Sequence, residues 1–232
     1  MRAGVFLEIY RELEDSLEAK YAGKKRHYSS VIFEYLNDNE SKPIRDKLDV
    51  CREIRNLLTH TAKIGGEEVV EPSEAICTEL RACLEYVKRP PLAIDYATKG
   101  ENIMKAGLNQ SVLKIMRIME KNGYSHIPIM ENGSFVGVFS TSTVFSFVLN
   151  SQGKQIGYNT SISELQDLLP IKAHSENYEF VSRDTTLSEV RQKFETYKGR
   201  NKRVSVIFVT ENGSERERLL GMLTPWDVLG EK

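Results

Sequence analysis

The chain has 232 residues, of which 40% are hydrophobic and 28% are charged, and its formal net charge is -1. A chain of this length can bury the cores of two domains, and its balanced charge argues against a global nucleic-acid footprint or a polybasic membrane patch. No apolar run approaches the length of a membrane span and no signal-peptide pattern opens the chain, so we expect no membrane partner.

Residues 1–91 have the apolar spacing of α-helices and no strand-like alternation of any length. Apolar residues recur three and four positions apart in four segments, whose first apolar residues are Phe6, Val31, Ile44 and Ile76. Pro90 and Pro91 follow the fourth segment, where they end the helix and provide a hinge. We therefore predict an all-α helical bundle over residues 1–91.

The three cysteines, Cys51, Cys77 and Cys83, all lie on apolar helical stripes of this region. Their odd number and the lack of a CxxC pair argue against a disulfide framework and against a zinc site. We therefore expect buried thiols, no bound metal and a cytoplasmic location.

One group in the predicted bundle has residues suited to chemistry: Arg55, Asn56 and His60. Asn56 and His60 are four residues apart and share a helix face, which the long side chain of Arg55 can also reach. A histidine beside an arginine could act as general base and oxyanion stabiliser in RNA cleavage through the ribose 2′-OH. Alternatively, His60 is a helix C-terminal histidine favoured by the macrodipole and Arg55 is a surface charge. Residues 64–67 are expected to form an open polar loop after this helix.

This motif resembles the signature of the HEPN superfamily of small helical bundles, Arg-x(4–6)-His with an asparagine often following the arginine. The resemblance implies either a metal-independent ribonuclease that works as a homodimer or a non-catalytic module that binds RNA or nucleotides. RNA is therefore one partner to consider.

The remainder of the chain contains an internal duplication. Residues 137–143 and 221–227 share a pattern of glycine, apolar residues and a hydroxyl, and residues 125–133 and 205–213 share an apolar run followed by Asn-Gly. The helical stripe of Val112, Ile115 and Met119 likewise matches that of Leu187, Val190 and Phe194. Each copy predicts a helix, a strand, a turn, a second strand and a second helix.

The two copies resemble CBS (cystathionine β-synthase) domains, which occur as tandem pairs. The first repeat spans residues 95–150 and the second residues 161–232, so we predict an α+β fold in which the bundle of residues 1–91 precedes a CBS pair at 92–232. The resemblance implies an adenine ligand such as AMP, ADP, ATP or S-adenosylmethionine, bound between the repeats.

The second repeat keeps the complete ligand pattern. Gly221 has no Cβ, so a flat ring could approach its backbone. By resemblance, Thr224 would contact phosphate and Asp227 the ribose. The same residues also form a capping-box pattern, with Pro225 at the first helical position, and both interpretations stay open.

In the first repeat, Ser140 stands in place of the first hydroxyl and Thr143 in place of the acid. A single hydroxyl is a weaker partner than a carboxylate for a ribose diol, so we expect one competent and one degraded site. Further candidate ligand residues lie on neighbouring strands: His126, Tyr178, Phe180, Arg203 and Ser205.

These secondary candidates have plain structural alternatives. His126 could pack within its strand, and Pro128 marks this strand as an edge or a rim of the sheet. Arg203, next to Lys202, could neutralise phosphate or simply be solvated. Trp226 is expected to pack at the mouth of the site.

Three functions remain open from the sequence. The leading one is a sensor, in which an adenine nucleotide (ATP, ADP or AMP) bound by the repeats controls the helical domain of a homodimer. The alternatives are a nucleotide-regulated ribonuclease and a helical domain that serves only for dimerisation or partner docking.

Overall fold

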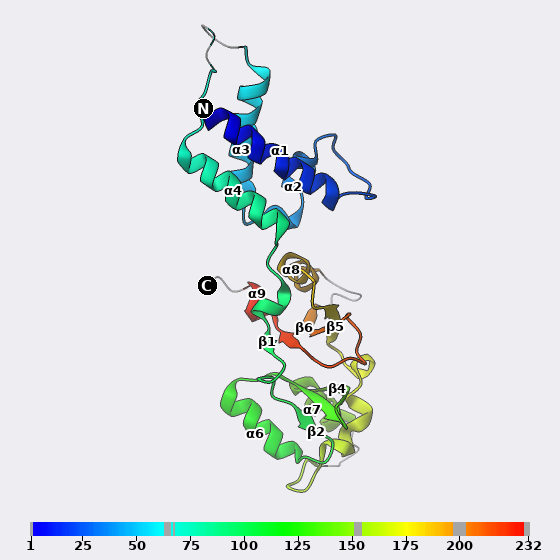
Figure 1. Cartoon of the computed structure of the whole chain (residues 1–232). Coiled ribbons are helices and arrows are strands. Elements are labelled where there is room, and N and C mark those ends of the chain that lie inside the picture. Colours follow the sequence, from blue (N-terminus) through cyan, green and yellow to red (C-terminus); the bar gives the residue numbers. More distant parts are fainter. Residues whose placement is uncertain (1, 63–65, 67, 151–154, 197–202, 230–232) are drawn as a thin grey trace. The chain divides into compact units, whose positions relative to one another are not determined.

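The computed structural model of the chain describes residues 2–62, 66, 68–150, 155–196 and 203–229 (Figure 1). The chain divides into two compact units, Met1–Pro91 and Leu92–Lys232, which are described in turn. Most of the loop expected at residues 64–67 lies outside the described residues. In the described part of the chain, no helix combines the length and apolar character needed to cross a membrane.

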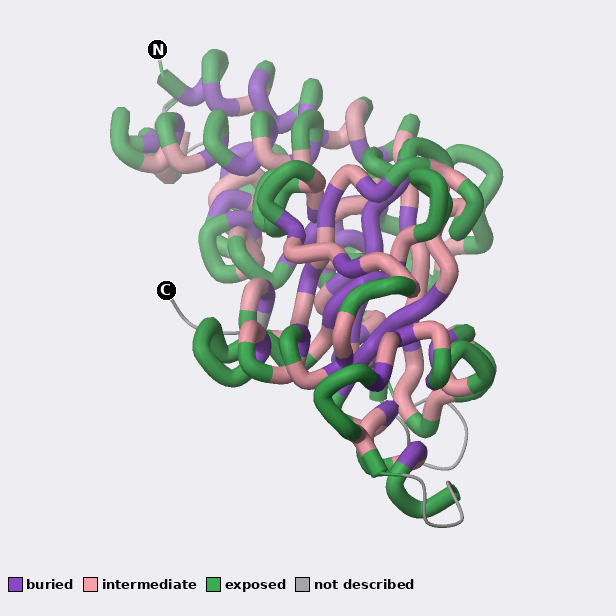
Figure 2. The backbone as a smooth tube through the Cα atoms, turned by 90° about the horizontal axis from the view of Figure 1, so that it is seen from below, coloured by how far each residue is buried: buried purple, intermediate pink, exposed green. Residues whose placement is uncertain are grey.

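The first unit is all-α, as predicted. Its described residues form the helices α1 (Arg2–Lys20), α2 (Val31–Leu36), α3 (Arg45–His60) and α4 (Glu74–Lys88) and the short 3-10 helix η1 (Asn39–Ser41). The Ser73 hydroxyl accepts a hydrogen bond of 3.2 Å from the backbone N–H of Ile76, which caps the start of α4. Buried and exposed positions alternate along α1 (Figure 2), as the three- and four-residue spacing of its apolar residues requires.

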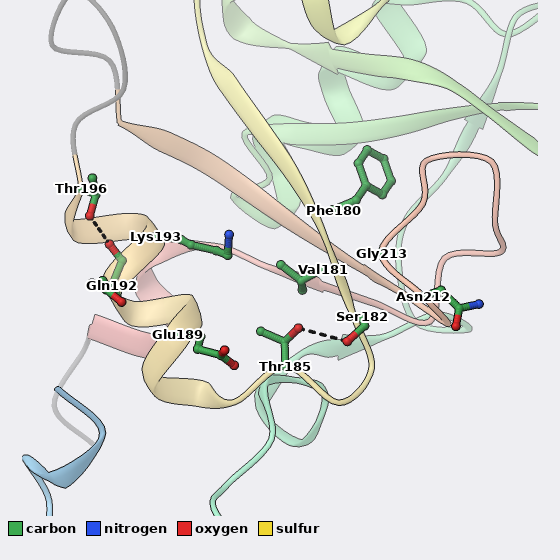
Figure 3. A pocket seen from close by; sticks show the side chains of 10 residues that line it. All are labelled: Phe180, Val181, Ser182, Thr185, Glu189, Gln192, Lys193, Thr196, Asn212 and Gly213. Carbon is green, nitrogen blue, oxygen red and sulfur yellow. Dashed lines mark hydrogen bonds between the residues drawn. The ribbon is translucent and has the colours of Figure 1, made fainter. Parts of the chain in front are cut away.

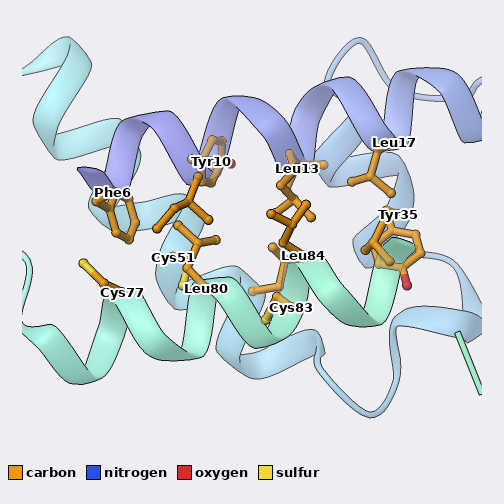
Figure 4. Packing of buried hydrophobic residues seen from close by; sticks show 14 of the residues in the cluster. Phe6, Tyr10, Leu13, Leu17, Tyr35, Cys51, Cys77, Leu80, Cys83 and Leu84 are labelled. Carbon is orange, nitrogen blue, oxygen red and sulfur yellow. The ribbon is translucent and has the colours of Figure 1, made fainter. Parts of the chain in front are cut away.

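The core of this unit lies between α1 and α4. Figure 4 shows Leu13 of α1 pointing toward Leu80 and Leu84 of α4. Leu13 and Leu80 have no exposed surface. The three cysteines are free and buried, as expected from their helical stripes. Burial raises the pKa of Cys51 to about 12 and that of Cys83 to about 11, so both thiols are protonated at neutral pH.

The second unit is α+β, as predicted. Its first half contains α5 (Ala93–Tyr96), β1 (Thr98–Lys99), β2 (Ala106–Gly107), α6 (Val112–Asn122), β3 (His126–Glu131), β4 (Ser134–Ser140), α7 (Thr141–Asn150), η2 (Ile162–Leu168) and η3 (Ile171–Ala173). Its second half contains β5 (Asn177–Ser182), α8 (Leu187–Glu195), β6 (Val204–Thr210), β7 (Gly221–Leu223) and α9 (Pro225–Leu229).

The strands form one sheet for each repeat, and the two sheets show the duplication directly. Their strand orders are β2-β3-β4 and β1-β7-β6-β5. In the first sheet Ile129 pairs with Gly137, and in the second Val209 pairs with Gly221, so matching residues occupy matching positions. Asn132 and Gly133 turn the first hairpin with φ of 49° and 81°, as two-residue turns require.

At these two glycines, the segment that precedes the first strand of one repeat packs closely against the sheet of the other repeat. A Cβ on Gly137 would lie 2.1 Å from the carbonyl oxygen of Leu169, in the segment that leads into β5. A Cβ on Gly221 would lie 2.7 Å from the Cβ of Ala97, in the segment that leads into β2. The repeats are therefore interlocked by close backbone packing.

Pro128 was expected to mark either an edge strand or a rim of the sheet. The edge is wrong, because β3 is the middle strand of its sheet. The short strand β2 pairs with Ile129 and Met130, one and two residues beyond the proline. Pro128 itself is not paired with β2, so its missing N–H costs no hydrogen bond to that strand.

Candidate functional site

The predicted ligand residues of the second repeat meet where β7 ends and α9 begins. The backbone N–H and the hydroxyl of Thr224 both donate to Oδ2 of Asp227, at 2.7 and 2.8 Å. Both residues are half-buried. The structure thus contains the capping arrangement that the Thr-x-x-Asp pattern predicted, and a ligand role for the pair stays a prediction.

The capping bonds leave room for a ligand on the same carboxylate. In the described part of the chain, the two hydrogen bonds to the Asp227 side chain both fall on Oδ2. A carboxylate has about four lone-pair sites over its two oxygens, so Oδ1 can accept further hydrogen bonds. Gly221 lies nearby in the chain, but the space left by its missing Cβ is filled by Ala97 and Ile94. This packing accounts for the glycine, and contact between its backbone and a ligand stays a prediction.

Two other candidates lie at the start of the neighbouring strand. Ile207 of β6 pairs with Leu223, which places the beginning of β6 beside Thr224. Ser205 is half-buried there, and Arg203, one residue before β6, is exposed. Lys202 lies outside the described residues. The positions of Ser205 and Arg203 suit contact with a ligand at Thr224, a role that remains a prediction.

Two predicted residues of the first repeat, His126 and Ser140, contact a carboxylate that sequence analysis missed. Glu176, which directly precedes β5, is bonded through Oε1 to Nε2 of His126 at 3.1 Å. Its Oε2 accepts hydrogen bonds from the hydroxyls of Ser140 at 2.8 Å, Ser142 at 2.6 Å and Tyr178 at 2.7 Å. Four side chains from β3, β4, α7 and β5 thus converge on one acid.

This environment stabilises the charged form of Glu176. Burial alone would raise its pKa, but the hydrogen bonds from His126, Ser142, Tyr178 and Ser140 outweigh burial and hold the pKa well below its usual range. Burial and the bond to Glu176 raise the pKa of Tyr178, so its phenol stays protonated as a donor. Burial lowers the pKa of nearby His174, whose Nδ1 lies 3.9 Å from Oε2 of Glu176.

The Thr143 side chain is buried and bonded to the backbone at the start of its own helix. Its Oγ1 accepts a hydrogen bond of 3.0 Å from the backbone N–H of Ser140, and only 2% of the residue is exposed. The hydroxyl that replaces the acid therefore caps α7, in the way that Asp227 caps α9.

Phe180 lies apart from both groups. Its ring packs against Phe135 and Phe208 with centroids 5.3 and 5.2 Å away, and it also lines an open pocket of about 520 Å³ beside α8 (Figure 3). The charged groups of this pocket already have partners, since Glu189 caps α8 through Thr186 and Lys193 pairs with Glu179 at 2.9 Å. We assign no function to the pocket.

In the helical unit, Arg55 reaches His60, as expected. Nη1 of Arg55 lies 3.4 Å from Nε2 of His60, while Nη2 lies 3.5 Å from Oε1 of Glu14. The guanidinium also lies 5.6 Å from the centre of the Tyr10 ring. Arg55 and Asn56 line a pocket of about 320 Å³. A catalytic role for this group stays a prediction.

The sequence of the second unit matches a known family over both repeats. The CBS domain family matches residues 93–150 and 171–232, which is more than half of the chain. The chain belongs to the CBS-domain family. The family match does not extend to the helical unit, so the HEPN resemblance stays a prediction.

Comparison with solved structures gives further CBS proteins. The CBS domain pair of protein MJ0100, in complex with 5′-methylthioadenosine and S-adenosyl-L-methionine, is 19% identical, with 60% of this chain and 92% of that chain covered and a TM-score of 0.41. CBSX2 in complex with AMP is 18% identical, with coverage of 60% and 93% and a TM-score of 0.42. A putative signal-transduction protein with CBS domains from Burkholderia ambifaria MC40-6 is 15% identical, with coverage of 60% and 90% and a TM-score of 0.43. No curated protein matches the sequence.

Proposed function

We propose that the CBS pair binds an adenine nucleotide at Thr224 and Asp227 and that the bound nucleotide controls the helical unit. The observation that carries the proposal is the pairing of a half-buried threonine and a half-buried aspartate at 2.8 Å, in the repeat that keeps the complete pattern of a CBS chain. Asp227 would accept the ribose hydroxyls through Oδ1 while Oδ2 retains its capping bonds, and Thr224 would face the phosphate. Arg203 and Ser205 would complete the site from β6.

Control of the helical unit requires a difference in affinity. A nucleotide shifts an equilibrium between two arrangements of the chain only if it binds one arrangement more tightly than the other. The segment that contains Ala97 contacts Gly221 beside the proposed site and follows Pro90 and Pro91, which end the helical unit. A nucleotide that changes the packing at Gly221 would act directly on this connection.

Ligand identity and control are tested together on the full chain. AMP, ADP, ATP and S-adenosylmethionine, with GMP as a control, are compared by thermal unfolding, since a ligand that binds only the folded state raises the melting temperature. Hydrogen exchange then compares α1 and α4 with and without the best ligand. Stabilisation by an adenine nucleotide together with altered exchange in these helices supports the sensor, and unchanged exchange restricts the proposal to ligand binding.

Homodimerisation is the second part of this proposal. Two large apolar side chains of α7, Phe145 and Leu149, are 66% and 67% exposed and lie four residues apart on one helix face. Trp226, at the second position of α9, is 88% exposed, which overturns the expectation that it packs. Exposed apolar groups of this size on the two equivalent helices support association with a second copy.

A metal-independent ribonuclease is the alternative function, and one observation favours it. The 3.4 Å contact between Arg55 and His60 brings the predicted stabiliser and base together on an exposed helix end. The contact between Arg55 and Glu14 opposes it, because a paired carboxylate offsets the positive charge that a phosphate needs. Incubation of the full chain with a broad RNA panel, with and without ATP, ADP and AMP, decides between the two functions.

A further inference from the structure

In each repeat the hydroxyl that follows the second strand of the hairpin donates to a carboxylate, but the carboxylate comes from a different part of the chain. In the second repeat, the hydroxyl of Thr224 donates to Asp227 at 2.8 Å. In the first repeat, the matching hydroxyl of Ser140 donates to Glu176, also at 2.8 Å. Glu176 therefore supplies the acid that the first repeat lacks at Thr143, and it does so from the segment that opens the second repeat.

The Glu176 carboxylate uses all the donors that converge on it. His126 contacts Oε1, while Ser140, Ser142 and Tyr178 donate to Oε2. Each of the three hydroxyls has a single proton, and because it donates that proton to Oε2, none is left for a second anion. A further 2.8 Å bond between Ser125 and Nδ1 of His126 holds the imidazole in place.

The second repeat offers a comparison within the same molecule. Alignment of the helical stripe at Val112 with that at Leu187 places Glu101 at the position of Glu176. Glu101 is exposed, whereas the side chain of Glu176 is 23% exposed and bonded to four groups. The closure of the polar site is therefore particular to the first repeat.

We propose that Glu176 is a built-in ligand that occupies an oxyanion site of the first repeat, formed by His126, Ser140, Ser142 and Tyr178. The site would take a small carboxylate once the Glu176 side chain is removed, and in the native chain it is closed to anionic ligands. This inference extends the proposed function to the first repeat, because it restricts nucleotide binding to the second. Its test uses no nucleotide, so the two proposals can fail separately.

The test is chemical rescue of Glu176→Ala in the full chain. Removal of the side chain leaves four converging donors without their acceptor, so we expect the melting temperature to fall by roughly 5–10 °C in sodium chloride. In about 0.2 M sodium acetate at matched ionic strength, bound acetate should restore roughly half of this loss, with saturation as its concentration rises. If the variant is unfolded in chloride, circular dichroism in acetate makes the same comparison.

Three proteins serve as controls. The wild-type chain and Glu176→Gln, which keeps the side-chain volume, should show no difference between acetate and chloride. Glu101→Ala removes the exposed carboxylate at the matching position and should likewise show none. A Glu176→Ala chain that gains no more from acetate than Glu101→Ala would overturn the proposal, as would acetate stabilisation of the wild-type chain equal to that of the variant.

Discussion

The Ser140 hydroxyl donates a hydrogen bond of 2.8 Å to the Glu176 carboxylate and so joins the last strand of the first sheet to the segment that opens the second repeat. The bond belongs to a cluster of four donors around one acid. Such a cluster favours the ionised carboxylate, and its contribution to stability must therefore depend on pH.

Acid should weaken the fold through Glu176. The folded chain holds the pKa of Glu176 below its ordinary value of 4.5, so the unfolded chain binds this proton first as the pH falls. The stabilisation is complete above that ordinary value and is lost progressively below it. We expect the difference in free energy of unfolding between pH 6 and pH 3.5 to be smaller in Glu176→Gln than in the wild-type chain, by roughly 1 kcal/mol.

Urea unfolding at the two pH values measures this difference. Equal losses of stability in the two proteins would show that Glu176 is not held in its charged form.

Gly137→Ala should destabilise the repeat unit. The added methyl group would lie 2.1 Å from the backbone oxygen of Leu169, which cannot move without breaking its 2.9 Å hydrogen bond from Val138. We expect a loss of about 2–4 kcal/mol in the free energy of unfolding. Gly4→Ala in α1 is the control: nothing lies within 4 Å of its added methyl group, and alanine favours a helix by up to about 1 kcal/mol. The prediction fails if both variants are as stable as the wild-type chain.

Charges on the exposed face of α7 should disrupt a homodimer. Phe145→Asp combined with Leu149→Asp places two charges where apolar side chains would be buried against a second copy. Light scattering at tens of micromolar should report a dimer for the wild-type chain and a monomer for this variant. Asn150→Asp, which adds one charge at the exposed end of the same helix, should remain dimeric. A monomeric wild-type chain would refute the proposal.

If the helical unit cleaves RNA, His60→Ala should abolish the activity and EDTA should not, because the ribose 2′-OH supplies the nucleophile. Thr59→Ala is the matched control, since Thr59 is an exposed neighbour whose hydroxyl donates to the Arg55 carbonyl at 2.8 Å. Gel analysis of RNA incubated with each protein measures the effect. Cleavage that persists in His60→Ala would exclude the assigned base.

The fold was predictable because local patterns determine its elements. The spacing of Phe6, Leu13 and Leu17 indicates one buried helix face, and Asn132-Gly133 indicates a hairpin turn, so both follow from neighbouring residues. The duplication added long-range information, since two similar segments must fold into two similar sheets.

Features that depend on distant contacts could not be predicted in this way. Glu176 lies in a polar stretch typical of a loop, and its partners His126 and Ser140 are far from it in the chain. The one available signal was that Glu101 and Glu176 occupy matching places in the two repeats. Trp226 was expected to pack because large aromatic side chains usually do, yet nothing in the sequence identifies which helix face meets solvent.

Mutation of Asp227 and of the matching Thr143 tests which repeat binds the adenine nucleotide. Asp227→Ala should weaken adenine-nucleotide binding by about 1.5–3 kcal/mol, the usual contribution of hydrogen bonds to a charged group. Thr143→Ala should have a much smaller effect, because the Thr143 hydroxyl is buried and bonded to the Ser140 backbone. Asp227→Asn controls for the helix cap, since its amide oxygen can still accept from Thr224. Equal losses of affinity in Asp227→Ala and Thr143→Ala would refute the asymmetry between the repeats.

The central claim is that one adenine nucleotide binds per chain, at the second repeat. Isothermal titration calorimetry of the wild-type chain with AMP, ADP and ATP tests it most directly, because the heat curve gives affinity and stoichiometry together. We expect one site per chain for at least one of these nucleotides, with binding lost or strongly weakened in Asp227→Ala. No binding at millimolar concentration, or two equivalent sites per chain, would contradict the account.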